Sequence, residues 1–145
     1  MEPRTDDVLA GGRQALQRGA WGEARAAFEA VAGSEAGPEA YEGLGAAALG
    51  QGDLAAGFAA HEEAYRRFRE RGDARGAGRV AAQLAWNYFN LRGEPAIANG
   101  WTRRAHRMLD ALEPCVEQGR LALAEGDALL FGAQDPVGAG QRAQH

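Results

Sequence analysis

Three amide side chains are spaced so that they could act together. Gln83, Asn87 and Asn90 are separated by four and by three residues. On a helix this spacing places them on one stripe, opposite Leu84 and Tyr88. Because an amide both donates and accepts hydrogen bonds, the stripe could hold a peptide backbone or a polar small molecule. The alternative is a solvated polar face, which every amphipathic helix has.

Residues of two earlier helices, Arg13 and Glu42, are expected to line the same groove. Trp86 lies among the amides in the sequence and could stack on a ligand. The preferred interpretation of the aromatic cluster Trp86, Tyr88, Phe89 and Trp101 is that it forms the core of a helix pair. A closed cavity beside Trp86 would favour a small-molecule site over a peptide groove.

The sequence shows no residue set for catalysis or metal binding. His61 and His106 have no acidic or cysteine partner at the spacing of metal ligands, and no HExxH pair is present. Cys115 has no histidine nearby in the sequence that could activate its thiol. We therefore expect a protein without metal, cofactor or enzymatic activity. A small helical enzyme is the least favoured alternative.

The most basic stretch is residues 65–71, which Arg75 and Arg79 extend. It could contact phosphate or an acidic partner. Local pairing is the preferred interpretation, because Arg66 can pair with Glu62 or Glu63, and Arg67 with Glu63, at steps of three and four residues.

Length and composition predict one all-α domain. The chain has 145 residues, a formal net charge of −4 and 33 alanines, against only eight valines, isoleucines and threonines. Alanine favours helices, and strands need more β-branched side chains. The acidic balance argues against direct nucleic-acid binding. No signal peptide or membrane span is visible, so a cytoplasmic location is expected.

Short breaks around Gly19, Gly52 and Gly93, and a fourth at residues 133–136, divide the chain at intervals of 33 to 41 residues. This periodicity indicates stacked helix–turn–helix units. We expect about seven helices: hairpins at residues 6–33, 37–71 and 74–112, an unpaired helix at 114–132, and a flexible tail at 136–145. The expected helix caps and first-turn prolines are Asp6 or Asp7, Pro38, Asp53 and Pro95.

The expected seventh helix lacks a partner helix. Leu129, Leu130 and Phe131 would leave an apolar surface, whereas terminal repeats normally present a polar outer face. We expect this surface either to form a homodimer or another protein contact, or to be covered by further chain in a longer protein.

The second hairpin resembles the tetratricopeptide repeat. The residues that carry the resemblance are Tyr41, Leu44, Gly45, Ala48, the turn at 52–54, Gly57 and Ala64. The first hairpin matches mainly in its second helix, and the third departs at Trp86, where the family has a small residue. The resemblance implies a right-handed stack of antiparallel hairpins with a concave groove, in which Asn87 occupies a peptide-binding position.

Longer stretches, at residues 19–28, 64–73, 84–88 and 92–101, resemble the helical-repeat region of actinobacterial LuxR-type transcriptional regulators. That resemblance implies a non-catalytic interaction or sensor module associated with transcriptional regulation, whose groove docks a peptide or protein partner. A small-molecule-binding effector domain is the alternative.

Overall fold

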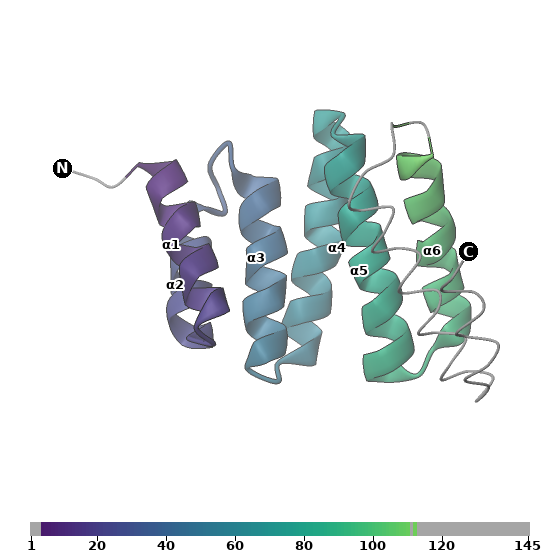
Figure 1. Ribbon diagram of the computed structural model, residues 1–145, viewed down its shortest axis with the longest axis horizontal. Coiled ribbons are helices and arrows are strands. Elements are labelled where there is room, and N and C mark those ends of the chain that lie inside the picture. Colours follow the sequence, from purple (N-terminus) through teal and green to yellow (C-terminus); the bar gives the residue numbers. More distant parts are fainter. Residues whose placement is uncertain (1–3, 111, 113–145) are drawn as a thin grey trace. The chain divides into compact units, whose positions relative to one another are not determined.

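The computed structural model describes residues 4–110 and 112, and this part of the chain is all-helical without strands. Its six helices are α1 (Thr5–Gln17), α2 (Trp21–Val31), α3 (Gly37–Gly50), α4 (Leu54–Arg71), α5 (Ala74–Arg92) and α6 (Pro95–Leu109). The chain divides into two compact units, Met1–Asp73 with α1–α4 and Ala74–His145 with α5 and α6. In the first unit α1 packs on α2, α2 on α3, and α3 on α4, whereas α5 pairs with α6 in the second (Figure 1).

Three of the connections share one turn geometry. Gly19, Gly52 and Gly72 have φ values of 74°, 80° and 79°, in the left-handed region that favours glycine. After each glycine, the next residue donates its N–H to the carbonyl five residues back, as in the bond of 2.9 Å from Asp53 to Ala48. This is the Schellman arrangement. The fourth such glycine, Gly93, has a φ of 62° in a wider turn, since Glu94 donates to Tyr88. The sequence breaks at these glycines are therefore true helix ends.

Glycines bring the helices of the first unit close together around Phe28 of α2. A Cβ on Gly12 of α1 would lie 2.8 Å from Cζ of the Phe28 ring, and a Cβ on Gly43 of α3 would lie 2.5 Å from its Cε1. Both glycines are buried. The aromatic ring thus occupies space that any other residue at these two positions would need. Around it lies the buried cluster Leu9, Ala15, Ala24, Val31, Ala40 and Ala47.

In the α3–α4 pair a ring also lies directly against a glycine, here the imidazole of His61 against Gly45. Its side chain is 2 % exposed, and a Cβ on Gly45 would lie 2.5 Å from its Nε2. Phe58, Ala64 and Phe68 are buried on the same side of α4. Glycines in the segment 43–50 thus permit close helix packing.

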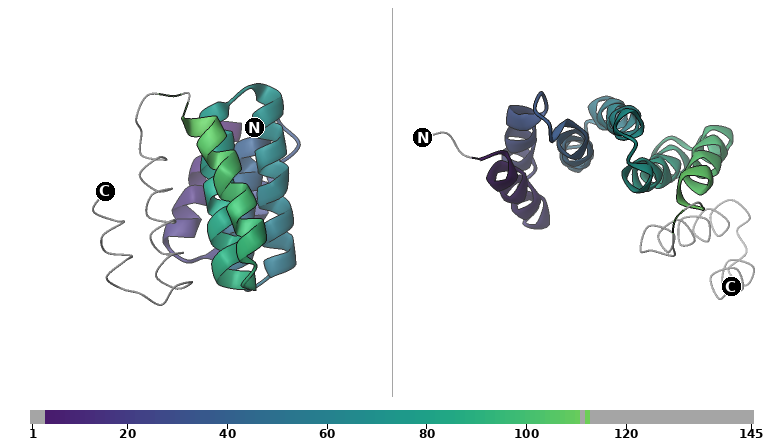
Figure 2. Two further views of the ribbon diagram at one scale, coloured as in Figure 1. Left: turned by 90° about the vertical axis from the view of Figure 1, so that its right-hand side faces the viewer. Right: turned by 90° about the horizontal axis from the view of Figure 1, so that it is seen from above.

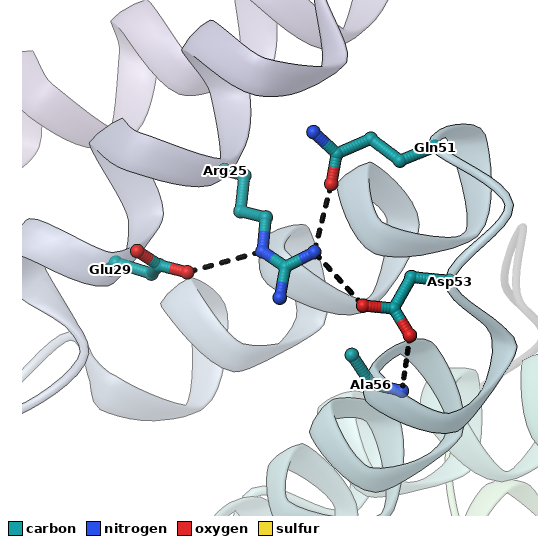
Figure 3. A network of polar contacts seen from close by, with 5 residues as sticks. All are labelled: Arg25, Glu29, Gln51, Asp53 and Ala56. Atoms are coloured by element: carbon teal, nitrogen blue, oxygen red, sulfur yellow. Dashed lines mark hydrogen bonds and ion pairs between the residues drawn. The ribbon is translucent and has the colours of Figure 1, made fainter.

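Arg25 of α2 connects the first hairpin to the turn of the second (Figure 3). Its Nη1 donates to Gln51 Oε1 at 2.8 Å and to Asp53 Oδ2 at 3.3 Å, while its Nε donates to Glu29 at 3.2 Å. Asp53 also accepts a bond of 3.2 Å from the Ala56 N–H through its other oxygen. Asp53 is therefore both the N-cap of α4, as expected, and an ion-pair partner of Arg25.

In the second unit α5 and α6 lie side by side, joined by the turn at Gly93 (Figure 2). Gly78 of α5 lies against Leu109 of α6, whose Cγ would be 2.5 Å from a Cβ on that glycine. The other buried side chains of this hairpin include Val80, Leu84, Tyr88, Ala98, Trp101 and Ala105.

The structure confirms Pro38 and Pro95 in the first turns of α3 and α6. It corrects the start of α1: Arg4 is the N-cap, without a side-chain hydrogen bond, and Asp6 and Asp7 lie inside the first turn. Their acidic side chains still suit the positive end of the helix dipole. The expected helix at 114–132 and tail at 136–145 lie outside the described residues. None of the helices in the described part combines the length and apolar character that crossing a membrane requires.

Candidate binding sites

Helix α5 exposes one narrow stripe along most of its length. We define the α5 stripe as Arg75, Arg79, Gln83, Trp86 and Asn90, which are exposed or half-buried. The spacings of four, four, three and four residues keep these side chains on one face. Ten other residues of this helix are buried, including Asn87, which is fully buried. A partner can therefore contact α5 mainly through this stripe.

Trp86 is the largest side chain of the α5 stripe and is 38 % exposed. It lies between Gln83, three residues before it, and Asn90, four residues after it. The exposed apolar ring is thus flanked on both sides by amide side chains. This differs from the sequence-based arrangement, in which Asn87 was the middle residue.

The two amides are held in place by bonds within the helix. Gln83 Nε2 donates to Asn87 Oδ1 at 2.8 Å, and Asn90 Nδ2 donates to the Trp86 carbonyl at 3.0 Å. Each uses an N–H for this bond, which leaves the side-chain oxygens of Gln83 and Asn90 as acceptors toward a ligand. Asn87 accepts the bond that orients the Gln83 side chain, and Asn87 itself is fully buried.

The other aromatic residues of this hairpin belong to its interior. Tyr88 and Trp101 are 8 % and 9 % exposed. Arginines cover both rings, with Arg104 lying 4.4 Å above the Trp101 centroid and Arg92 5.8 Å above that of Tyr88. Trp86 alone of the three has a large exposed surface, which corrects the expectation that the whole aromatic cluster forms the core.

In the first unit an open cleft of about 670 Å³ contains Arg13. Its lining comes from α1, from the α2–α3 connection with the first turn of α3, and from the last residue of α4: Arg4, Thr5, Asp6, Leu9, Arg13, Ser34, Glu35, Ala36, Glu39 and Arg71. We call it the N-terminal cleft. Glu42, expected to share a groove with Arg13, is half-buried on α3 and is not part of this lining. Sequence reasoning missed the cleft because its residues come from three separate segments.

One pair of charges in the N-terminal cleft is tightly engaged. Arg71 Nη1 is 2.5 Å from Glu39 Oε1, and Arg71 also donates to the backbone carbonyl of Glu35. The bond to Glu39 raises the pKa of Arg71. The second oxygen of Glu39, Oε2, is buried and has no hydrogen-bond partner among the described residues.

The basic stretch at the end of α4 is mostly paired locally. Glu63 accepts bonds from Arg66 at 2.5 and 2.7 Å and from Arg67 at 3.2 Å. These bonds, led by that from Arg66, lower the pKa of Glu63. The prediction that Glu63 neutralises these arginines is confirmed, and this segment offers fewer free cations than its sequence suggests.

His61 is buried where α4 packs on α3. Burial lowers its pKa, and this effect outweighs the opposing influence of Glu42 and of a hydrogen bond to the Glu42 backbone. Across the described residues, no group of three or more His, Cys, Asp or Glu side chains is arranged to hold a metal ion. Cys115 and the apolar triplet Leu129, Leu130 and Phe131 lie outside the described residues.

Fold and surface together define, over residues 4–110 and 112, an all-helical protein with two candidate sites, the α5 stripe and the N-terminal cleft. Compared with protein-family models, curated proteins and solved structures, the chain matches none.

Proposed function

We propose that this chain is a non-catalytic protein-interaction module of the tetratricopeptide-like type, and that a peptide segment of its partner docks on the α5 stripe. The observation that carries the proposal is the exposed ring of Trp86 between two oriented amides. The shared Schellman turns at Gly19, Gly52 and Gly72 support the repeat character of the hairpins.

The size of the α5 stripe suits an extended peptide. From Arg75 to Asn90 the helix rises about 22 Å, at roughly 1.5 Å per residue. An extended peptide covers this length with about six or seven residues. Its backbone N–H groups would meet the free oxygens of Gln83 and Asn90, while an apolar side chain would cover Trp86.

Trp86 is the expected energetic centre of such an interface. Tryptophan and arginine dominate binding hot spots, and truncating one costs about 2 kcal/mol or more of binding free energy. The resemblance to the helical-repeat region of LuxR-type regulators favours a partner from transcriptional regulation. The association with transcriptional regulation is part of the proposal.

The test selects peptides from a random displayed library on the full chain and measures their affinity by fluorescence polarisation. Trp86→Ala should weaken the selected peptides by about tenfold or more. Gln83→Ala and Asn90→Ala should each weaken them by a smaller factor. Ile97→Ala is the matched control, because Ile97 is 45 % exposed but belongs to α6.

Equal affinity for the wild type and the Trp86→Ala variant would refute docking on the α5 stripe. Failure to enrich any peptide would do the same. Loss of binding in the Ile97→Ala control would place the interface elsewhere in the chain.

A further inference from the structure

The α5–α6 hairpin carries a charge opposite to that of the rest of the chain. Residues 74–110 contain six arginines against two acidic residues, Glu94 and Asp110, which gives a formal charge of +4. Because the whole chain has a net charge of −4, the remaining residues together carry −8. Glu94 precedes α6 and Asp110 follows it, so neither α5 nor α6 contains an acidic residue. Charge segregated in this way produces a local positive potential that attracts an anionic partner.

On the α5 stripe the positive charge lies at one end. Arg75 and Arg79 occupy the first two turns of α5, and its first turn contains no acidic residue. Arg75 is exposed and forms no ion pair or hydrogen bond with another described residue. The helix dipole adds partial positive charge at the same end. Arg92, the third arginine of α5, lies over the ring of Tyr88 instead. The beginning of the stripe therefore favours carboxylates.

The other end of the α5 stripe is apolar and offers hydrogen-bond acceptors. Trp86 is 38 % exposed, and the side-chain oxygens of Gln83 and Asn90 stay available beside it. A peptide backbone supplies N–H donors to these oxygens, whereas the phosphodiester backbone of DNA has none. The acidic remainder of the chain also repels a long polyanion. The anionic partner that fits the whole stripe is therefore a peptide.

The spacing along the α5 stripe sets the spacing along such a peptide. Arg75 and Arg79 are about 6 Å apart along the helix axis, and Arg79 and Trp86 about 10 Å, at roughly 1.5 Å per residue. An extended chain advances about 3.3 Å per residue, so the two separations correspond to about two and three peptide residues. The matching peptide has two acidic residues separated by one residue, and an apolar residue three positions further along.

From these observations we infer that the segment docked on the α5 stripe is an acidic peptide with this spacing. Its two carboxylates pair with Arg75 and Arg79, since a guanidinium group suits carboxylate oxygens. Its apolar side chain covers Trp86, and the backbone between them donates to Gln83. The inference rests on the proposed function, because it names the chemistry of the peptide that docks there.

The experiment measures fluorescence polarisation of short labelled peptides on the full chain. One probe has two aspartates separated by a serine, then two serines and a leucine. A second has these residues in reverse order, because the stripe admits either chain direction, and matched neutral probes carry asparagine for both aspartates. One acidic probe should bind, and its neutral form should bind about fivefold more weakly. Added salt should weaken the acidic probe more than the neutral one.

Substitutions locate the carboxylates on the stripe. Arg75→Gln should weaken the acidic probe about two- to fivefold and leave the neutral probe unchanged. Arg79→Gln should act in the same way, whereas Arg79→Lys keeps the charge and should restore most of the affinity. Arg103→Gln is the matched control, because it removes the same charge from an exposed arginine of α6 and should have no effect. Trp86→Ala should weaken the acidic and the neutral probes alike.

The outcomes separate this inference from the proposed function. Equal binding of acidic and neutral probes, weakened in both cases by Trp86→Ala, would overturn the acidic chemistry and leave peptide docking intact. An acidic probe that binds Trp86→Ala as tightly as the wild type would count against docking on the stripe itself.

Three further results would overturn the inference. One is that neither acidic probe binds, while peptides selected from the library bind without acidic residues. Another is that Arg103→Gln weakens the acidic probe as much as Arg75→Gln does, because the effect would then be general attraction and not contact. The third is displacement of the acidic probe by a thymidine oligonucleotide of equal charge, which would assign the surface to nucleic acid.

Discussion

The ring of Phe28 fills the space beside Gly43: a Cβ at this glycine would lie 2.5 Å from the ring's Cε1. Real Cβ atoms do not approach other atoms this closely, so the helices themselves would have to move to accept a side chain. In this contact a large side chain of α2 meets the bare backbone of α3, and two hairpins of the first unit depend on it.

Gly43→Ala should therefore destabilise the protein by about 1–3 kcal/mol, the usual cost of overpacking a core. Gly11→Ala is the control, because Gly11 is also in a helix but has nothing within 4 Å of its Cβ position. It should stabilise by about 0.5–1 kcal/mol through higher helix propensity. Urea denaturation of both variants checks the opposite signs, and equal effects would contradict the packing described for Phe28.

The two roles of Asp53 can be separated by substitution. Asp53→Ala loses both the α4 cap and the ion pair with Arg25, whereas Asp53→Asn keeps a good cap and loses the charge. We expect Asp53→Ala to cost about 1 kcal/mol for the cap, and Asp53→Asn to cost less. Thermal unfolding at low and high salt checks this, because only the ion-pair part should shrink with salt. An equal loss for both variants would mean that the cap contributes little.

His61 should make stability fall in mild acid. Its pKa is lowered in the folded state, mainly by burial, from the ordinary value of 6.5. The unfolded chain therefore binds more protons below pH 6.5, and the free energy of unfolding decreases as the pH falls through this value. Above pH 6.5 His61 costs the folded state no stability, because the imidazole is then largely neutral in the unfolded chain as well.

The measurement is the unfolding free energy of the wild type and of His61→Phe between about pH 7.5 and pH 5. The wild type should lose stability across this interval and the variant should lose less. Glu63 does not confuse the result, because its lowered pKa moves its own loss of stability below pH 4.5. A slope equal in both proteins would show that His61 is not the group responsible.

Trp86 and Trp101 should differ sharply in their effect on folding. Trp101 is 9 % exposed inside the α5–α6 hairpin, whereas Trp86 is 38 % exposed. Trp101→Ala should cost about 3–5 kcal/mol, the range for emptying a core aromatic site. Trp86→Ala should cost much less and leave the circular dichroism spectrum unchanged. A large loss in Trp86→Ala would make this residue structural and would weaken the proposal of peptide docking.

The sequence predicted the turns and caps of the helices better than it predicted which helix faces are buried. The turns at Gly19, Gly52 and Gly93 and the capping by Asp53 are local, because glycine conformation and a side chain three residues away decide them. The burial of Asn87 is not local. Periodicity identifies a polar stripe, but the width of the buried arc depends on what packs around α5. Ten buried residues on that helix leave room for Trp86, and not Asn87, at the surface.

The N-terminal cleft shows the same limit more strongly. Arg13 was expected to line a groove, but its companions there, Glu39 and Arg71, are 26 and 58 residues away in the sequence. Spacing rules act over one or two helical turns, so they cannot connect such segments. The expected groove of Arg13 with Glu42 and the amides of α5 stays a prediction.

The contact of Phe28 with both Gly12 and Gly43 also constrains how this sequence can change over evolutionary time. Neither glycine can gain a side chain while the aromatic ring is present, and a smaller residue in place of Phe28 would leave a void until one of the glycines is enlarged. Related chains should therefore vary at these three positions together. Where the phenylalanine is replaced by a side chain of intermediate size, the two glycines should be replaced by residues of intermediate size as well.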